Sequence, residues 1–251
     1  MRNTILIILL TSLSLSLFGC NSQESKLPSI ALNTHSAVTP VPRYDQWWTD
    51  RHNAILERVK KGNPELIMIG DSITQGWEND GKEIWEKYYA KYNALNLGFG
   101  GDGTQHVLWR LYNGEINGIS PKVAVVMIGT NNSAHNPSEE TSEGIIAIVQ
   151  KLRHDLPQTK ILLLAIFPHT ENPDNPRRAI NAKTSQLASV IADNKWVYYL
   201  DINKSFLDSK GELSPNIMPD FLHPNANGYQ IWAEAMEPAL NRLVLENNIT
   251  N

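Results

Sequence analysis

A serine, a histidine and an aspartate in this chain have the residue types of a nucleophilic catalytic site. Ser72 directly follows Asp71, and Asp220 precedes His223 by three residues. A serine hydroxyl is a poor nucleophile until a base removes its proton, and an imidazole oriented by a carboxylate can serve as that base. The sequence therefore predicts Ser72 as the nucleophile, His223 as the base and Asp220 as the group that orients the imidazole.

Acyl transfer also needs hydrogen-bond donors for the negative charge on the tetrahedral intermediate. The backbone N–H groups of Ser72 and Gly101 and the side-chain amide of Asn131 are candidates for this oxyanion hole. Loss of one such donor typically lowers turnover by about a hundredfold or more. Asp102, next to Gly101, is a candidate brace for the glycine turn.

Short apolar runs alternate with amphipathic segments along most of the chain. The apolar runs predict buried strands at 66–69, 94–97, 123–128, 161–166 and 196–200. The amphipathic segments predict helices at 44–59, 82–92, 104–113, 138–154, 176–194 and 225–246. This alternation is typical of the α/β class and predicts a three-layer α/β/α sandwich around a five-stranded parallel sheet. Ligands of such sheets bind outside the carboxyl ends of the strands, where the candidate residues stand.

Four blocks of the sequence resemble, in order, those of the GDSL or SGNH hydrolase superfamily. They are Gly70-Asp71-Ser72-Ile73, Gly100-Gly101-Asp102, Gly129-Thr130-Asn131-Asn132 and Asp220-Phe221-Leu222-His223. Segments 96–111 and 121–132 are similar to the catalytic subunits of the intracellular platelet-activating factor acetylhydrolase, and the resemblance covers roughly 60–245. It implies a flavodoxin-like SGNH hydrolase fold with Ser72 as nucleophile, an oxyanion hole completed by Gly101 and Asn131, and a triad finished by Asp220 and His223. Bacterial members of similar pattern include carbohydrate acetylesterases, aryl esterases and lysophospholipases.

The first 19 residues have the pattern of an export signal. Arg2 precedes an apolar run at 5–18 that is shorter than a membrane-spanning helix requires. Segment 17–20 resembles the lipobox of bacterial lipoproteins, in which the cysteine is lipidated and begins the mature chain. Cys20 is the only cysteine in the sequence, and Asn21 after it resembles the sorting pattern for an outer membrane. An ordinary signal peptide and an uncleaved anchor helix remain alternatives.

These features predict three parts of the chain. Residues 1–19 form a lipoprotein signal peptide, residues 20–42 a polar tether punctuated by prolines, and residues 43–251 the SGNH hydrolase domain. The expected location is a bacterial outer membrane, on its periplasmic or exposed side, with attachment through lipid on Cys20.

Two further residues are candidates for the rim of the substrate site. Trp77 lies five residues beyond Ser72 and offers an aromatic face for a sugar. Asp71 directly precedes Ser72, and its alternative role is to hold the turn by hydrogen bonds. We expect no cofactor and no metal, because the other histidines lack metal-ligand spacing and 98–101 matches no dinucleotide or phosphate-binding fingerprint.

Composition narrows the class of function. With 22 Lys or Arg against 26 Asp or Glu, the formal net charge is −4, which argues against a nucleic-acid partner. We expect an exported serine esterase that removes acetyl or another short acyl group from a carbohydrate or glycan. The alternatives are a hydrolase of platelet-activating-factor-like or lysophospholipid esters and a catalytically silent glycan-binding lipoprotein. The lack of a long apolar insertion favours short acyl groups, and export favours glycans.

Overall fold

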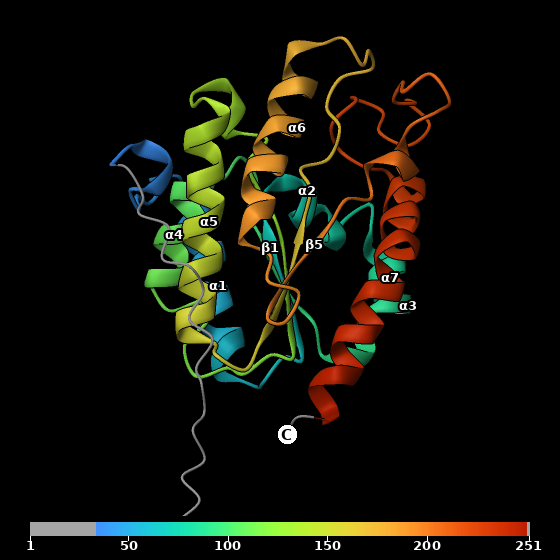
Figure 1. Ribbon diagram of the computed structural model, residues 1–251. Helices are drawn as coiled ribbons and strands as arrows, with labels where there is room; N and C mark the ends of the chain where they lie inside the picture. The colour runs from blue at the N-terminus through green and yellow to red at the C-terminus, as the bar shows by residue number, and fades with distance from the viewer. Residues whose placement is uncertain (1–33, 250–251) are drawn as a thin grey trace, which may run out of the picture.

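Five strands form one parallel sheet in the structure, a computed structural model that describes residues 34–249 (Figure 1). They are β1 (Leu66–Gly70), β2 (Leu95–Gly98), β3 (Val123–Met127), β4 (Lys160–Leu164) and β5 (Val197–Leu200). Their order is β2-β1-β3-β4-β5, and every neighbouring pair is parallel. All five predicted strands are confirmed, with ends within two residues of those expected.

Helices cover both faces of the sheet, so the expected three-layer α/β/α sandwich is confirmed (Figure 1). One face carries α1 (Gln46–Lys60), α4 (Thr104–Tyr112), α5 (Ser138–Asp155) and α6 (Pro176–Ala188). The other carries α3 (Lys82–Tyr88) and α7 (Ala226–Ile249). The short helix α2 (Ser72–Gln75) was not predicted, because four residues are too few to show a helical period. Short 3-10 turns are η1 (Ser36–Val38), η2 (Gly76–Glu78), η3 (Ala90–Tyr92), η4 (Asn132–Ala134), η5 (Ser189–Ile191) and η6 (Asn203–Phe206).

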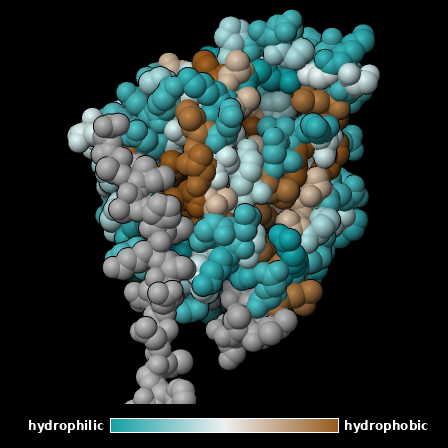
Figure 2. Space-filling view, in the orientation of Figure 1, coloured by the Kyte–Doolittle hydropathy of each residue, from teal (hydrophilic) through white to brown (hydrophobic). Residues whose placement is uncertain are grey.

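The surface drawn in Figure 2 is mainly hydrophilic, with hydrophobic residues showing in patches between polar ones. Within residues 34–249, no helix combines the length and the apolar character that crossing a membrane requires.

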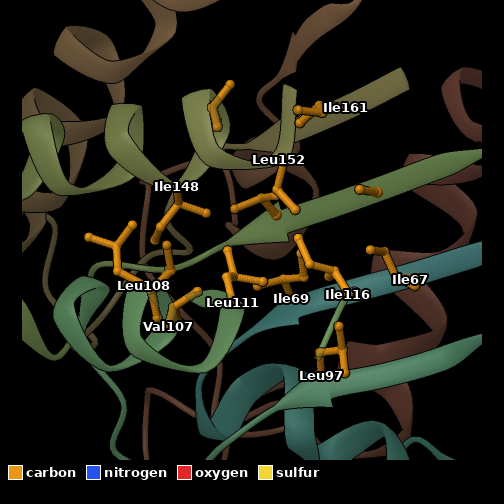
Figure 3. Packing of buried hydrophobic residues seen from close by; sticks show 14 of the residues in the cluster. Ile67, Ile69, Leu97, Val107, Leu108, Leu111, Ile116, Ile148, Leu152 and Ile161 are labelled. Atoms are coloured by element: carbon orange, nitrogen blue, oxygen red, sulfur yellow. The ribbon is translucent and has the colours of Figure 1, made fainter. Parts of the chain in front are cut away.

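Alternate residues of each strand face opposite layers of the sandwich. Ile67 and Ile69 belong to the apolar cluster shared with α1, α4 and α5 (Figure 3), whereas Leu66 and Met68 belong to the cluster shared with α7. All four side chains are at most 1% exposed. Burial of one side chain of this size contributes about 1.5 to 3 kcal/mol to stability. The strand that precedes Ser72 is therefore held from both sides.

Residues 35–42, which we call the N-terminal strap, pack against the domain. Ala37 is fully buried, and its carbonyl accepts a hydrogen bond of 2.7 Å from Thr104 Oγ1 at the start of α4. His35 Nε2 lies 2.9 Å from a carboxylate oxygen of Glu143 on α5. These residues therefore belong to the folded domain.

The predicted tether at 20–42 is accordingly wrong over its last part. The strap has no sustained hydrophobic period, and its contacts are with residues distant in sequence, so nothing local in the sequence indicated them. The predicted signal peptide, Cys20 and the earlier part of the tether lie outside the described residues.

Candidate active site

The candidate site residues lie at the carboxyl edge of the sheet. Ser72 follows β1, the turn containing Gly101 follows β2, and Asn131 follows β3. Because β1 lies between β2 and β3, the connections of the chain run to opposite sides of it. Such a switch point opens a crevice outside the strand ends, where ligands of parallel sheets bind.

Ser72 begins α2 in a tight strand-to-helix turn. Gly70 makes the turn possible, since a Cβ atom there would lie 2.5 Å from the Met127 carbonyl oxygen. Asp71 is fully buried and caps the helix, with its Oδ1 accepting the Ile73 N–H at 3.0 Å. The prediction that Asp71 belongs to the substrate rim is therefore wrong, because no part of it reaches the surface. Its alternative role, holding the turn, is confirmed.

His223 lies in the loop before α7, 151 residues from Ser72 along the chain, yet the two side chains meet. Ser72 Oγ is 2.8 Å from His223 Nε2, and His223 Nδ1 is 2.6 Å from Asp220 Oδ2. An Nδ1–H that donates to the carboxylate leaves Nε2 as the acceptor for the serine hydroxyl. The three side chains thus have the geometry of a nucleophile, a base and an orienting acid.

The loop itself fixes the Asp220 carboxylate. Asp220 Oδ1 accepts the backbone N–H groups of Leu222 at 3.1 Å and His223 at 2.7 Å. Phe221 has a φ of 57°, in the left-handed region that is rare for residues other than glycine. This conformation turns the loop back on itself. Partial burial raises the pKa of Asp220, but the hydrogen bonds from the His223 ring and from the two backbone N–H groups hold it below its usual value. The carboxylate is therefore ionised beside the imidazole at neutral pH.

The turn after β2 passes close to Ser72, since a Cβ atom at Gly100 would lie 4.0 Å from the Ser72 Cβ. Gly101 has a φ of 76°, which favours glycine. Asn131 Nδ2 donates to the Asp102 carbonyl in the same turn at 2.9 Å. An amide nitrogen carries two hydrogens, so one of them remains for a substrate oxygen. The structure thus brings the three predicted oxyanion donors to one edge.

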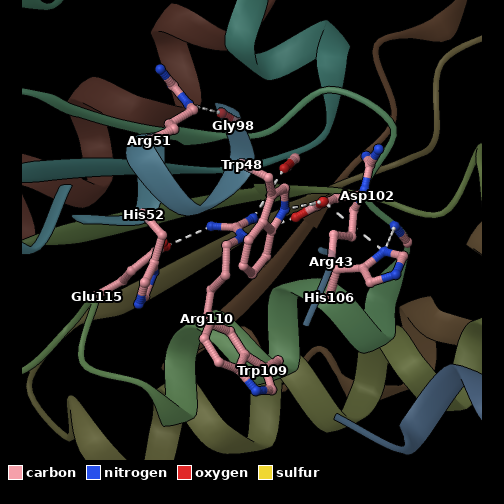
Figure 4. A network of polar contacts seen from close by, with 12 residues as sticks. Arg43, Trp48, Arg51, His52, Gly98, Asp102, His106, Trp109, Arg110 and Glu115 are labelled. Carbon is pink, nitrogen blue, oxygen red and sulfur yellow. Dashed lines mark hydrogen bonds and ion pairs between the residues drawn. The ribbon is translucent and has the colours of Figure 1, made fainter. Parts of the chain in front are cut away.

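A buried polar network holds the turn after β2 through Asp102 (Figure 4). Asp102 accepts hydrogen bonds from Trp48 Nε1 at 2.8 Å and from Arg110 Nε at 2.9 Å. Arg110 also donates to the Gly70 carbonyl at 3.4 Å and to Glu115 at 2.5 Å. One fully buried guanidinium therefore joins the end of β1 to the turn after β2.

The charge of Asp102 depends on this network. Burial raises the pKa of Asp102 to about 6, although Arg110 and the Trp48 hydrogen bond oppose the rise. The carboxylate is therefore ionised at neutral pH and paired with Arg110. The prediction that Asp102 braces the glycine turn is confirmed. Sequence reasoning missed Trp48 and Arg110, and the available signal was an arginine inside an otherwise apolar stretch of a predicted helix.

A cavity of about 300 Å³ lies beside the candidate oxyanion donors and is bordered by Gly101, Asn131 and Leu222. Its polar side chains are imidazoles, amides, one hydroxyl and one guanidinium: His106, His135, His169, Gln105, Asn131, Asn132, Asn136, Thr130 and Arg177. Among the described residues, no aspartate or glutamate lines it. Within residues 34–249, no group of three or more His, Cys, Asp or Glu side chains is arranged to hold a metal ion.

Trp77 does not border this site. It is 1% exposed, and its ring centroid lies 4.4 Å from that of Tyr229 and 4.8 Å from that of Trp232. The turn η2 directs the indole into the apolar cluster shared with α7. The prediction that Trp77 forms part of the substrate rim is therefore wrong, because closeness to Ser72 in sequence does not set the direction of the side chain.

Trp47 is an exposed aromatic residue at this edge that sequence reasoning did not assign to the site. It is 42% exposed and lies 3.8 Å from the position of a Cβ atom at Gly100. Arg43 holds it in place, with its guanidinium 5.3 Å from the ring centroid and a hydrogen bond of 2.6 Å to the Gly100 carbonyl. The adjacent Trp48 is buried in the core, so helix geometry divides two neighbouring tryptophans between the core and the surface.

Known proteins share both the sequence and the architecture of this chain. Residues 68–231 match the model of the GDSL-like lipase/acylhydrolase family. Over 217 residues the chain is 38% identical to the platelet-activating factor acetylhydrolase IB subunit alpha1 of Homo sapiens, covering 85% of this chain and 92% of that protein. Over 203 residues it is 42% identical to the alpha2 subunit of Rattus norvegicus, covering 80% and 85%.

Two bacterial hydrolases of known structure share the fold. A GDSL-like lipase from Bacteroides thetaiotaomicron has a TM-score of 0.59 at 20% identity, covering 78% of this chain and 97% of that one. A catalytic mutant of an acetylxylan esterase from Geobacillus stearothermophilus has a TM-score of 0.57 at 20% identity, covering 74% and 96%. At this identity the likeness is one of fold alone.

The predicted resemblance to GDSL and SGNH hydrolases is therefore confirmed by sequence and by architecture. The family match spans the strands and loops that carry Ser72, Gly101 and Asn131, and the longer matches to the acetylhydrolase subunits cover at least four fifths of the chain. On this basis the chain belongs to the GDSL-like lipase/acylhydrolase family and is a carboxylic ester hydrolase.

Proposed function

We propose that this hydrolase is an exported serine esterase that removes acetyl or other short acyl groups from carbohydrates. Ser72 Oγ attacks the ester carbonyl carbon while His223 Nε2 takes the hydroxyl proton, and Asp220 stabilises the imidazolium that forms. The Ser72 and Gly101 N–H groups and Asn131 Nδ2 donate to the oxyanion. His223 returns the proton to the leaving alcohol oxygen. A water molecule then repeats these steps on the acyl-enzyme and releases the carboxylic acid.

The distances of 2.8 Å and 2.6 Å along the Ser72, His223 and Asp220 chain support this mechanism. The observation that supports a carbohydrate alcohol is the polar cavity next to Gly101 and Asn131. Sugar hydroxyl groups can pair with its amides and imidazoles, whereas an alkyl chain would strip water from those groups and leave them unpaired, at about 1 to 3 kcal/mol for each.

An acetylated phospholipid is the second candidate substrate. The curated relatives at 38% and 42% identity are named platelet-activating factor acetylhydrolase subunits, which supports acetyl as the acyl group and a lipid as the alcohol. Both candidates thus share the same short acyl group and differ in the alcohol.

The mechanism is tested with p-nitrophenyl acetate and no added metal. We expect hydrolysis by the wild type, loss of at least about a thousandfold in Ser72→Ala and His223→Ala, and a smaller loss in Asp220→Asn. The matched control is Ser209→Ala, an exposed loop serine, which should retain activity. Full activity in a folded Ser72→Ala protein, or an activity that EDTA removes, would contradict the mechanism.

The substrate is tested by two comparisons. In a p-nitrophenyl ester series from acetate to decanoate we expect acetate or propionate to be best, with about a 10- to 200-fold loss for each methylene that does not fit. Acetate release from acetylated xylo-oligosaccharides and from platelet-activating factor then separates the sugar from the lipid. Release from the phospholipid alone would favour the lipid candidate, whereas a preference for eight or more carbons would contradict the short acyl group that both candidates share.

Export and lipidation belong to the same proposal and rest on the sequence of residues 1–21. Arg2, the apolar run and the single cysteine at position 20 support a lipid-anchored protein of a bacterial outer membrane. Such a location would give the enzyme access to glycans outside the cytoplasm.

A further inference from the structure

We infer that the cavity beside the oxyanion donors binds an anionic group, a carboxylate or a phosphate, on the alcohol part of the ester, and that Arg177 recognises it. The inference rests on the proposed esterase function. It adds a binding site and a substrate class, namely acyl esters of acidic sugars or sugar phosphates.

The start of α6 places Arg177 at the cavity. Asn175 caps the helix by accepting the Arg177 N–H at 3.0 Å, and Pro176 fixes the first helical position. The neighbouring Arg178 has a different role, because its guanidinium donates to carbonyl groups in the loops at 169–171 and at Gly211. Arg178 therefore fastens the loops, while Arg177 lines the cavity.

Arg177 has no carboxylate partner within residues 34–249. No described carboxylate oxygen lies within 4.0 Å of its guanidinium, and its side chain stays exposed. Since no aspartate or glutamate lines the cavity either, its one formal charge is positive. A planar guanidinium forms paired, charge-assisted hydrogen bonds with carboxylate and phosphate groups, which a neutral sugar hydroxyl cannot match.

His169 adds a second polar side chain to the cavity. It lines the cavity, and its Nδ1 is buried with no hydrogen-bond partner among the described residues. Burial, followed by the charge of Arg177, lowers the pKa of His169, so that the neutral ring can donate through one nitrogen.

The position of the cavity assigns the anion to the alcohol and not to the acyl group. Leu222, next to His223, borders the cavity, and His223 is the group that returns a proton to the leaving oxygen in the proposed mechanism. The leaving alcohol therefore lies on this side of Ser72. Arg177 lines the same cavity, so a charged substituent on the alcohol would meet its guanidinium.

The test uses three mono-acetylated methyl glycosides that differ only at carbon 6. This carbon bears a hydroxyl in the glucoside, is the carboxylate carbon in the glucuronide and bears a phosphate in the glucoside 6-phosphate. For the wild type we expect kcat/KM on at least one charged ester to exceed that on the neutral ester about tenfold or more, through KM. This preference should fall as salt rises. Arg177→Gln should bring the ratio of charged to neutral ester close to one. Arg242→Gln, an equal charge change at an exposed residue on α7, should leave the ratio unchanged.

The same data separate the two possible failures. Hydrolysis of p-nitrophenyl acetate by the wild type combined with equal kcat/KM on all three sugars would overturn this inference and leave the esterase proposal standing. A preference that survives in Arg177→Gln would also overturn it. A wild-type protein that does not hydrolyse p-nitrophenyl acetate would count against the proposed function. The charged ester with the higher kcat/KM shows whether the cavity prefers a carboxylate or a phosphate.

Discussion

The Asp71 carboxyl group is removed from water directly before the proposed nucleophile. Its Oδ1 accepts the Ile73 N–H, whereas its Oδ2 has no hydrogen-bond partner among the described residues. Burial raises the pKa of Asp71 to about 7, against the opposing Ile73 hydrogen bond and with a smaller contribution from Asp102. The group that sequence reasoning placed on the rim thus carries a proton over much of the acidic range.

This raised pKa predicts how stability depends on pH. Between the unfolded value of 3.8 and about 7, the native protein binds more protons at Asp71 than the unfolded chain does, so this contribution to stability falls as pH rises. Asp71→Asn removes the titrating group. We therefore expect the free energy of unfolding of Asp71→Asn, measured in urea, to rise relative to that of the wild type by about 1 to 3 kcal/mol between pH 5 and pH 8. The surface change Asp174→Asn should follow the wild type, and a constant difference for Asp71→Asn would disprove the assignment.

Trp47 predicts a substrate effect that Trp77 does not. Trp47→Ala removes an exposed ring beside Gly100, so activity on acetylated xylo-oligosaccharides should fall about three- to tenfold more than activity on p-nitrophenyl acetate. Trp77→Ala should instead lower stability by about 3 to 5 kcal/mol, because it empties a site in the core. Kinetics on both esters and urea unfolding check the pair. Equal losses on both substrates in Trp47→Ala would mean that the ring only packs.

At the scale of elements, the N-terminal strap contacts the loop after η4 and the first turn of α4, which adjoin the segments that carry Asn131 and Gly101. Ser36 Oγ accepts a hydrogen bond of 2.7 Å from Asn136, in the loop between η4 and α5. The Val41 N–H donates to the Gln105 carbonyl near the start of α4 at 3.3 Å. Segments that the sequence assigned to a tether therefore help to fix the edge where the site lies.

Gly144 on α5 provides a test of this packing. A Cβ atom there would overlap the Thr104 side chain and lie 2.7 Å from the Ala37 carbonyl oxygen. Alanine gains up to about 1 kcal/mol in helix propensity over glycine, but overpacking costs about 1 to 3 kcal/mol, so the steric effect should win. We expect Gly144→Ala to be destabilised in urea, whereas Gly62→Ala, which has ordinary space, should change little. A stabilised Gly144→Ala protein would show that the strap yields easily.

At the scale of the whole molecule, the described residues hold all the groups of the proposed site, and the proposed lipid attachment point lies outside them. Ser72, Asp220 and His223 are carried by the sandwich between His35 and Ile249. Catalysis and attachment are therefore expected to be separable, because no group of the proposed triad comes from the first 33 residues.

This separation predicts the behaviour of Cys20→Ser. Radiolabelled palmitate should enter the wild type but not the variant, because the chain has no other cysteine. A lipid-modified cysteine carries more than one acyl chain, which gives lasting membrane attachment, so the variant should leave the membrane fraction. Its specific activity on p-nitrophenyl acetate should match the wild type. A wild-type protein that is unlabelled and released would instead support an ordinary signal peptide.

The sequence by itself determined the sheet and the residues at its edge. Buried parallel strands appear as short apolar runs, and Ser72, Gly101 and Asn131 follow three of them directly, so local pattern was sufficient. The pair Asp220 and His223 was also readable, because its geometry is set within one four-residue loop.

Only the tertiary structure decided which side chains face the substrate crevice and which the core. Trp77 and Trp47 are the same residue type, and neither has a local signal for its environment. In the fold, α7 covers Trp77, which is 1% exposed, whereas Trp47 stays 42% exposed. The Arg110 network, the docked strap and the cavity at Arg177 likewise join residues tens of positions apart. Burial and charge pairing depend on these long-range neighbours, and a single sequence without its fold carries no local signal of them.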